Sequence, residues 1–372
     1  MILLTACLSA CKNSERAEIS IIEGYDNPMK ENGEGVDYAD FYIKKLDVPS
    51  DIYLGSVQKI ACMEEYIILQ TMDGVYCFDS EGKYIRQYGT KGHGPGEYVQ
   101  VGGMLINHET KTVSLYDSFS CSMIRYASDG TYLGTESIPN DAFSLMFSAD
   151  VLEDDRIFIN YFLQNSQNTA FAVCDMQTFE RTEVLSYGIK SQSTTERTGI
   201  HSYNIHDGRV ECVLPFKNKV YCYNMQDSFP IYEIRTKKDI LSEEELSDMN
   251  YYSTINFEYI ENDDVFLGFN DIFETDSYLL FNTACNSYFL VDKLTMTGQR
   301  YSNYSFECAP LKYLPLLNIS AMHDDYLIGI MDSEAMEQME FDEKSDDTYL
   351  SVLEQYARNT EDGKIYLLYY KI

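Results

Sequence analysis

Residues 75–85, VYCFDSEGKYI, and residues 123–133, MIRYASDGTYL, carry one pattern twice, 48 positions apart. The shared positions hold an aromatic residue, a serine, an acidic residue, a glycine, a tyrosine and an aliphatic residue. Glycine accepts the backbone angles of a tight turn, and the apolar runs on both sides suit strands. Each copy therefore predicts a strand, a turn and a returning strand, and the repetition indicates a repeat architecture.

Three shorter copies follow at residues 173–178 (VCDMQT), 222–227 (CYNMQD) and 290–295 (LVDKLT). An apolar run suited to an inner strand precedes each copy, and a sixth run starts at residue 326. Units of about 45 residues with four short strands are typical of propeller blades. The sequence therefore predicts an all-β protein folded as a six-bladed β-propeller. The runs that precede the five copies are residues 66–70, 113–117, 156–161, 209–214 and 278–282.

Two insertions and one surplus strand complete the predicted organisation. Residues 237–255 contain LSEEEL, in which Ser242 can cap a short helix between blades four and five. Residues 332–358 predict an acidic, helical insertion in blade six. The strand expected at residues 41–48 is left over while blade six lacks a strand, so we expect it to close the ring. We assign residues 1–11 to a leader, 12–35 to a flexible tether and 36–372 to the propeller.

The leader carries a sorting signal. Residues 8–11, LSAC, resemble the lipobox of bacterial lipoproteins, whose cysteine, here Cys11, is lipidated after cleavage. Residues 4–7, LTAC, are a second match in a less suitable place. No basic residue precedes the apolar run as in a signal peptide, so a short buried strand is the alternative. No other stretch reaches the ~18 apolar residues of a membrane span. We expect a lipid anchor in the bacterial cell envelope, at the outer membrane, on its periplasmic or surface face.

Composition narrows the range of partners. The chain has 60 acidic and 28 basic side chains, and its net charge of −32 repels nucleic acids and anionic lipids. Its 32 Tyr and 19 Phe favour strands. The cysteines outside the leader are spread singly without a CxxC motif, so a zinc site is not expected. Cys212 and Cys222 flank a predicted turn, and they either form a disulfide or pack as buried thiols.

One segment resembles a known family. Residues 84–98, YIRQYGTKGHGPGEY, contain G-x-G-P-G-E and an aromatic residue, and they follow an F-D-x-x-G-K-Y turn. This phrase resembles the blade-to-blade connection of six-bladed propeller lipoproteins from Bacteroidetes-type bacteria, which are relatives of NHL-repeat propellers. Residues 46–55 look like the start of their first blade, whereas residues 361–364 lack the N-P that often opens their last strand. The resemblance covers nearly the whole mature chain and implies the fold and a lipid-anchored address, but most members have no assigned activity.

Candidate binding residues come from two regions. His93 lies in the glycine-rich stretch 89–96, which lacks the GxxxxGK[ST] spacing of a phosphate-binding loop and suits a rigid turn between blades. We expect His93 at the rim of the central channel. Aromatic residues near the first insertion could stack on sugars or peptides, or pack as ordinary strand residues. These aromatic residues are Tyr251, Tyr252, Phe257 and Tyr259.

A calcium site stays open as an alternative. Asn160, Asn204 and Asn282 lie on or near predicted inner strands, from which they could converge with acidic side chains on one ion. Related six-bladed propellers include calcium-dependent lactonases, so a hydrolase or lyase with a site in the central channel is the alternative function. No GxSxG, HExxH or Cys/His nucleophile signature is present in the sequence.

These observations favour a non-catalytic binding or scaffold module over an enzyme. We expect it to hold an envelope protein, a peptide or a glycan at the channel mouth or on the insertions. We also expect a monomer that needs no cofactor, binds no nucleic acid and touches the membrane only through its lipid anchor.

Overall fold

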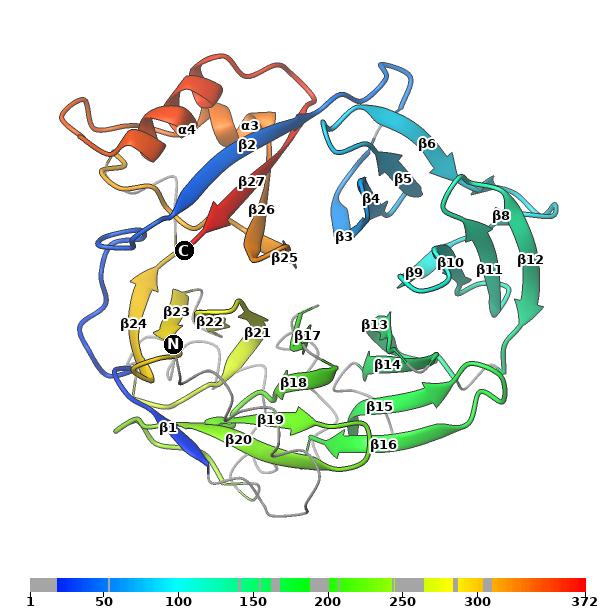
Figure 1. The fold of residues 1–372 in the computed structure, drawn as a ribbon, viewed down its shortest axis with the longest axis horizontal. Helices are drawn as coiled ribbons and strands as arrows, with labels where there is room; N and C mark the ends of the chain where they lie inside the picture. The colour runs from blue at the N-terminus through cyan, green and yellow to red at the C-terminus, as the bar shows by residue number, and fades with distance from the viewer. Residues whose placement is uncertain are drawn as a thin grey trace, which may run out of the picture.

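Six sheets of four or five strands are arranged around a common axis (Figure 1), and a further two-stranded sheet pairs residues 90–91 with residues 97–98. Each of the six sheets is a blade built mainly of consecutive antiparallel strands, which confirms the prediction of an all-β, six-bladed propeller. The computed structural model describes residues 19–52, 54–139, 142–153, 155–161, 168–187, 201–206, 208–242, 244, 264–283, 287–303 and 310–372.

Blades one to three use strands in chain order, from the axis outward. Their second strands are buried along nearly their whole length, because they lie between two neighbours within the blade. The strands are β3 (Val57–Met63), β4 (Tyr66–Thr71), β5 (Val75–Phe78) and β6 (Tyr84–Tyr88); β9 (Val101–Asn107), β10 (Thr112–Asp117), β11 (Ser122–Ala127) and β12 (Tyr132–Ser137); β13 (Met146–Val151), β14 (Arg156–Tyr161), β15 (Thr169–Asp175) and β16 (Arg181–Ser186).

Blades four to six repeat this plan, and blades four and six each gain a strand from the N-terminal region. The sixth blade has only three strands of its own, and β2 (Asp40–Leu46) pairs antiparallel with β27 as its outermost strand. The other strands are β17 (Tyr203–His206), β18 (Arg209–Val213), β19 (Lys219–Tyr223) and β20 (Ser228–Ile234); β21 (Phe269–Glu274), β22 (Tyr278–Thr283), β23 (Ser287–Asp292) and β24 (Thr297–Ser302); β25 (Ile319–His323), β26 (Tyr326–Asp332) and β27 (Ile365–Lys371).

The five sequence copies form the hairpin between the third and fourth strands of the first five blades. In four of them an Asp or Asn side chain at the end of the third strand accepts hydrogen bonds from backbone N–H groups of the turn. The second copy has Ala127 there, and Asp129 accepts from the N–H of Thr131 instead. These local bonds fix the turn and thus the register of each outer strand. The four accepting residues are Asp79, Asp175, Asn224 and Asp292.

The apolar runs that precede the copies are the second strands of their blades, not the innermost ones. Another strand lies inside each of them, next to the axis. Some of these innermost strands carry polar residues: β3 has a buried lysine, and β13 has Ser148 and Asp150. The apolar runs therefore indicate the second strand of each blade rather than the strand that lines the axis.

Residues 19–38, most of which sequence analysis assigned to a tether, are held against the propeller. β1 (Ser20–Ile22) adds a parallel fifth strand to β20 of blade four. Tyr25 is buried against the aromatic rings of blade five. The side chain of Asn32 exchanges two hydrogen bonds of 2.9 Å with the backbone of Leu316. The buried ring of Tyr25 and the hydrogen-bonded amide of Asn32 therefore hold residues 19–38 in place, although their polar composition suggested a tether.

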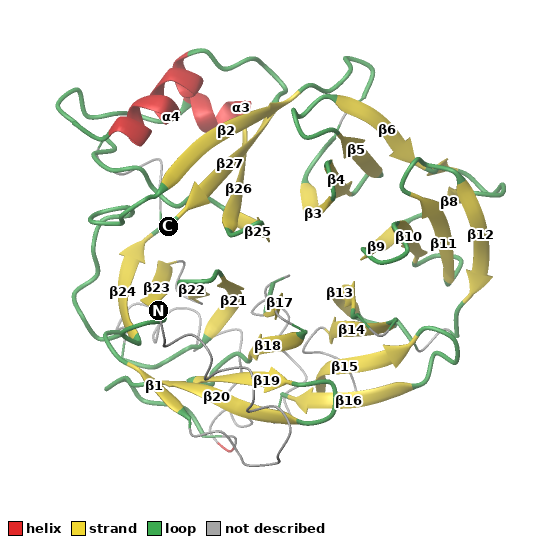
Figure 2. Cartoon of the chain, viewed as in Figure 1, coloured by secondary structure: helices red, strands yellow, loops and turns green. Residues whose placement is uncertain are grey.

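Two described helices form the predicted insertion of blade six (Figure 2). They are α3 (Ser333–Glu337) and α4 (Thr348–Arg358), capped by the carboxylates of Asp332 and Asp347. The buried residues of α4 pack on the core that blades five and six share. The other predicted helix, at residues 241–246, lies largely outside the described residues. No described helix is long and apolar enough to cross a membrane.

Candidate functional site

The two faces of the propeller differ in their loops. We call the face where the innermost strands begin the proximal face; it carries turns such as residues 72–74 and 118–121. The distal face is where the innermost strands end, at turns such as residues 64–65 and 324–325. The connections between successive blades return to the proximal face, so it holds the longer loops.

Five of the innermost strands carry a bulge near their proximal end. The pairing with the second strand skips one residue there, which leaves that residue outside the ladder. A bulge re-aims side chains and exposes backbone groups at a rim. The skipped residues are Gln58, Gly102, Phe147, Asn270 and Ser320.

A cavity of about 260 Å³ opens among the bulged strands of blades one to three. Its walls combine amide, hydroxyl and apolar groups, and Lys59 lies in its wall. Among the described residues that line it there is no carboxylate, although the chain carries 60 acidic side chains. This cavity, the mouth cavity, is suited to an uncharged chain segment. Its principal polar and apolar lining residues are Gln58, Gln70, Gln100, Met146, Phe147 and Ser148.

Lys59 ties three blades together beneath the mouth cavity. Its ammonium Nζ donates to the carbonyl oxygens of Met104 in blade two (3.2 Å) and Ala149 in blade three (2.7 Å). It also contacts the carboxylate of Asp150 at 2.6 Å. Because Lys59 is only 9% exposed, these three acceptors replace the water that a free ammonium would bind.

Asp150 extends this network to blade four. The phenol of Tyr203 donates to its second carboxylate oxygen at 2.6 Å. Burial and the neighbouring carboxylate hold the pKa of Tyr203 well above its usual range, so the phenol keeps its proton at physiological pH. Lys59, Asp150 and Tyr203, here called the mouth network, therefore join blades one to four as a fixed frame.

A second polar group lies between blades four and five. The backbone N–H of His201 donates to one oxygen of Asp271 at 3.0 Å, and Asn282 donates to the other at 3.0 Å. Burial lowers the pKa of His201 below its usual range, against the opposing effect of Asp271. The imidazole is therefore neutral at pH 7. One carboxylate oxygen of Asp271 therefore joins the two blades, and the other accepts a hydrogen bond within blade five.

Three large apolar side chains stand exposed around the proximal mouth. Met72 and Phe119, 68% and 71% exposed, lie in the turns that follow β4 and β10. Leu145, 48% exposed, immediately precedes Met146 of the cavity wall. We call these three residues the apolar rim. Sequence reasoning missed it, because single apolar residues in polar turns have no periodicity.

Leu145 also has an unfavourable backbone conformation. Its φ of 59° lies in the left-handed region, which costs an ordinary residue about 1 kcal/mol. An exposed leucine in such a position contributes little burial to offset this cost. Its side chain is therefore held at the rim at a cost in backbone energy.

The three asparagines proposed as calcium ligands are not brought together. Asn160 and Asn282 lie on second strands and donate to Ser148 and Asp271 of their own blades. Asn204 lies on β17, directly opposite Glu211 of β18. Within the described part of the chain, no group of three His, Cys, Asp or Glu side chains has the geometry to hold a metal ion.

His93 lies exposed in the turn between β7 (Thr90–Lys91) and β8 (Glu97–Tyr98). That turn packs beside β12, the outermost strand of blade two, since the Tyr126 hydroxyl donates to the Gly96 carbonyl and Tyr132 covers Gly96. The structure thus places His93 at the periphery. Cys212 and Cys222 are buried and are not joined in a disulfide. Cys11, Tyr251, Tyr252, Phe257 and Tyr259 lie outside the described residues.

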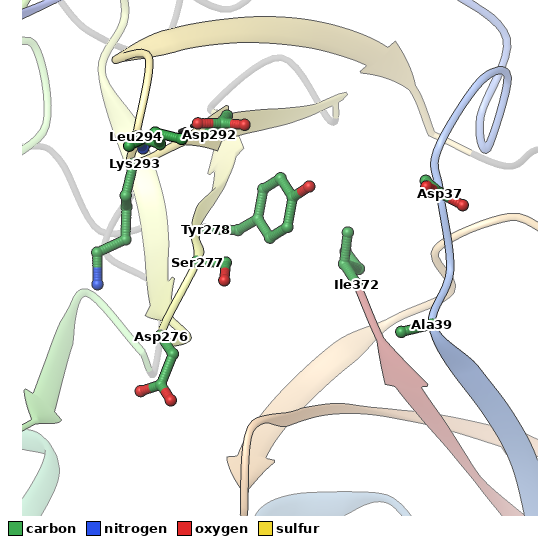
Figure 3. A pocket seen from close by; sticks show the side chains of 9 residues that line it. All are labelled: Asp37, Ala39, Asp276, Ser277, Tyr278, Asp292, Lys293, Leu294 and Ile372. Carbon is green, nitrogen blue, oxygen red and sulfur yellow. Dashed lines mark hydrogen bonds between the residues drawn. The ribbon is translucent and has the colours of Figure 1, made fainter. Parts of the chain in front are cut away.

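A larger cavity, of about 600 Å³, lies on the distal face between blade five, residues 37–39 and the C-terminus (Figure 3). The Tyr278 ring projects into it between Asp292 and Asp37. Lys293 is in its wall, but its ammonium is engaged by Glu274 at 2.6 Å and by the carbonyl oxygen of Thr275. This cavity therefore presents the acidic character of the surface as a whole, in contrast to the mouth cavity.

Comparison with known proteins agrees with the class that the fold defines, a six-bladed β-propeller. The chain belongs to the family described as "Domain of unknown function (DUF4934)", which residues 45–363 match. Its fold is similar to that of a "Putative exported protein" from Bacteroides fragilis, with a TM-score of 0.72 and 18% identity over 95% of this chain and 99% of that one. A DUF4221 family member from Bacteroides vulgatus is similar with a TM-score of 0.56 and 11% identity over 90% and 97%. No curated protein matches the chain.

Proposed function

We propose that this protein is a non-catalytic binding module of the bacterial cell envelope, which holds a protein partner over its proximal mouth. The observation that carries the proposal is the apolar rim beside a cavity whose described lining holds no carboxylate, in a protein of net charge −32. An apolar partner surface would cover Met72, Phe119 and Leu145, while a neutral segment of that partner enters the mouth cavity.

The chemistry of the rim favours a protein over a glycan. Met, Phe and Leu side chains gain free energy when an apolar protein surface removes them from water, and Met and Phe are enriched in such interfaces. The bulged strands add backbone donors and acceptors, which suit the peptide groups of an extended segment. The surrounding negative charge would repel acidic partners and so restrict which proteins can bind.

The proposed location in the cell envelope rests on the leader. Lipidation of Cys11 in the LSAC motif would tether a monomeric propeller to the membrane, with the body kept off anionic lipid by its charge. Similarity to an exported Bacteroides protein supports export of this chain. The periplasmic and the surface orientation of the outer-membrane anchor are both compatible with this proposal.

Site-specific photo-crosslinking in the producing bacterium tests the proposal. A photo-reactive amino acid at position 119 is expected to give one discrete adduct with another protein. The control places the same group at position 294, because Leu294 is 93% exposed but lies in the turn between β23 and β24, at the larger cavity. The same adducts from both positions, or none from position 119, would contradict the proposal. An adduct that contains only sugar would replace the protein partner by a glycan.

A further inference from the structure

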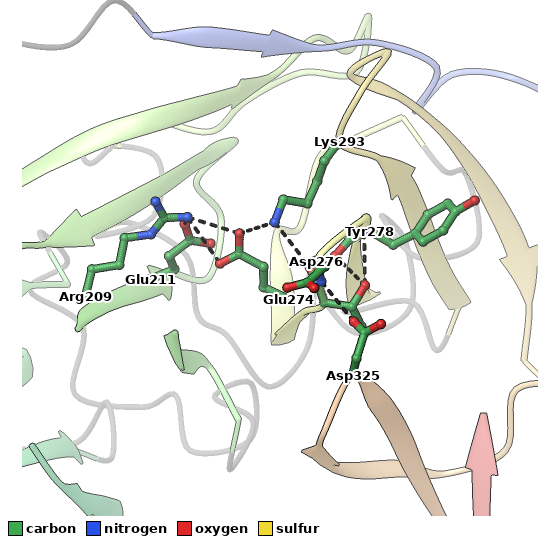
Figure 4. Close-up of polar contacts among 8 residues, drawn as sticks. Arg209, Glu211, Glu274, Asp276, Tyr278, Lys293 and Asp325 are labelled. Carbon is green, nitrogen blue, oxygen red and sulfur yellow. Dashed lines mark hydrogen bonds and ion pairs between the residues drawn. The ribbon is translucent and has the colours of Figure 1, made fainter. Parts of the chain in front are cut away.

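Two carboxyl side chains are fully buried where blades four and five meet at the distal side. Glu211 lies on β18 and Glu274 at the end of β21, and both are 0% exposed (Figure 4). Burying two carboxyl groups side by side is unfavourable when both are charged. The neighbouring cations decide which of them keeps its charge.

The cations are shared unequally. Glu274 receives the ammonium of Lys293 at 2.6 Å and the guanidinium of Arg209 at 3.0 and 3.4 Å. Arg209 also lies 2.9 Å from Glu211, but neither oxygen of Glu211 accepts a hydrogen bond of good geometry among the described residues. The contacts therefore favour an ionised Glu274 and a protonated Glu211, whose O–H can be donated to its partner.

The acid–base properties agree with this assignment. Burial and the repulsion of Glu274 raise the pKa of Glu211 to about 8, although Arg209 opposes the rise. Burial also disfavours the charge of Glu274, but Lys293 and Arg209 outweigh it and lower the pKa of that group. The two carboxyls thus hold one proton between them at neutral pH.

The other groups that face this pair come from every neighbouring strand. They supply no further lysine or arginine among the described residues, so once the proton is lost Glu211 has to share Arg209 with Glu274. They are Asn204 and His206 of β17, opposite Glu211 and Arg209; Cys222 of β19, opposite Glu211; and Tyr232 of β20, whose pKa is raised by burial and by both carboxylates.

We propose that Glu211 and Glu274 form a proton-operated lock between blades four and five, closed while the pair holds one proton and loosened when that proton leaves. In the closed state the pair is a hydrogen-bonded acid and carboxylate facing Arg209 and Lys293. In the loosened state two buried carboxylates repel each other across the contact of β18 with β21. The hydrogen bond from the Ile272 N–H to the His201 carbonyl, 2.8 Å, joins the same two blades. Hydrogen exchange at Ile272 therefore reports on whether the contact between these blades is closed or loosened.

The direction of the pH effect follows from the raised pKa. The unfolded chain loses the Glu211 proton near pH 4.5, whereas the folded chain keeps it to about pH 8. The contribution of this group is fully present below pH 4.5 and is lost as the pH rises to about 8. We expect the thermal midpoint to fall by about 2 °C per pH unit from this group alone between pH 5 and 8.

Glu211→Gln tests the lock, because its amide can donate to Glu274 as the protonated acid does but cannot titrate. We expect the thermal midpoint of this variant to lack the fall of about 2 °C per pH unit. Glu233 lies on the neighbouring strand β20 with its side chain 37% exposed, so Glu233→Gln should keep the slope of the parent protein. Hydrogen exchange at residues 269–274 should rise more steeply with pH than at blade two in the parent, and not in Glu211→Gln. Equal slopes in Glu211→Gln and the parent would overturn the proposal. So would exchange that rises equally in both blades.

If Glu211→Gln does not fold, a second variant, Glu274→Gln, still tests the proposal. Glu274→Gln removes the ionised partner and leaves Lys293 without its carboxylate, so it should lower the midpoint at every pH and retain no excess slope. A Glu274→Gln variant as stable as the parent would contradict the assigned charges. These residues lie away from the apolar rim, so either outcome leaves the proposed binding function untouched.

Discussion

Two buried ion clusters bridge blades in this propeller, and they balance their charges differently. The mouth network sets one ammonium, Lys59, against one carboxylate, Asp150, and adds a phenol that stays protonated. The distal lock sets two carboxyls beside two cations, but both cations bond to Glu274, and burial favours a proton on Glu211. We expect the first cluster to form a frame that is insensitive to pH, whereas the second makes the contact between its blades sensitive to pH. Substitutions in the mouth network should therefore shift stability by a constant amount, and those in the lock should change its slope with pH.

The largest effect is expected from Lys59→Met. The substitution leaves the Asp150 carboxylate without its cation and two carbonyl oxygens without their donor. It should lower the free energy of unfolding by about 3 kcal/mol, at the lower end for a broken buried pair because Asp150 is partly exposed. Urea denaturation measures it. Lys219→Met, which removes an exposed partner of Glu233, should cost less than about 0.5 kcal/mol. Equal losses in the two variants would contradict the frame.

Tyr203→Phe should cost about 1–2 kcal/mol, since it removes one hydrogen bond to a carboxylate and leaves the ring in place. The loss should be the same at pH 6 and pH 9, because the high pKa of Tyr203 keeps the phenol protonated throughout. Denaturation at both pH values measures it. A loss that disappears at pH 9 would mean that the phenol titrates there, and it would remove the contrast with the distal lock.

Leu145→Asn is expected to separate stability from binding. Asparagine tolerates the left-handed backbone better than leucine, so the variant should be more stable by roughly 0.5–1 kcal/mol. It should also weaken crosslinking from position 119, because it removes one of the three rim side chains. Thermal unfolding and adduct yield give the two readouts. A stabilised variant with full adduct yield would exclude Leu145 from the binding surface.

The smallest effect is expected from calcium. Because Asn160, Asn204 and Asn282 lie on three different blades, and Asn160 and Asn282 donate to other side chains, we expect neither calcium nor EDTA to shift the thermal midpoint by more than about 1 °C. A calcium-dependent rise of several degrees that EDTA abolishes would revive the lactonase-like alternative. A screen of lactone and ester substrates would then follow.

The fold was predictable because its signals are local. Each copy of the repeat contains its own turn, and the carboxylate or amide of residues such as Asp79 and Asn224 bonds to the backbone within four residues. The second helical insertion could also be found, since Asp347 caps α4 and its buried residues follow a helical period. Local chemistry of this kind can be recognised in a single sequence.

The site was not predictable, because its residues meet only in the folded ring. Lys59 lies 91 positions from Asp150, and Asp150 lies 53 positions from Tyr203. A lysine within an ordinary strand gives no sign that it will cross to two other blades. The same holds for Glu211 and Glu274, whose proton sharing depends on burial and on Arg209 and Lys293 together. The buried Tyr25 and Asn32 likewise gave no sign in the sequence that the N-terminal segment is held against the propeller.

The most direct test of the proximal mouth as the binding surface is a crosslinking comparison of two double variants. A photo-reactive group at position 100, in the cavity wall, reports on the partner in both. Met72→Ser/Phe119→Ser removes two rim side chains, and Leu133→Ser/Leu294→Ser removes two exposed apolar side chains elsewhere. We expect at least a tenfold loss of adduct from the first variant and full yield from the second. Equal yields from the two variants would contradict the proximal mouth as the binding surface.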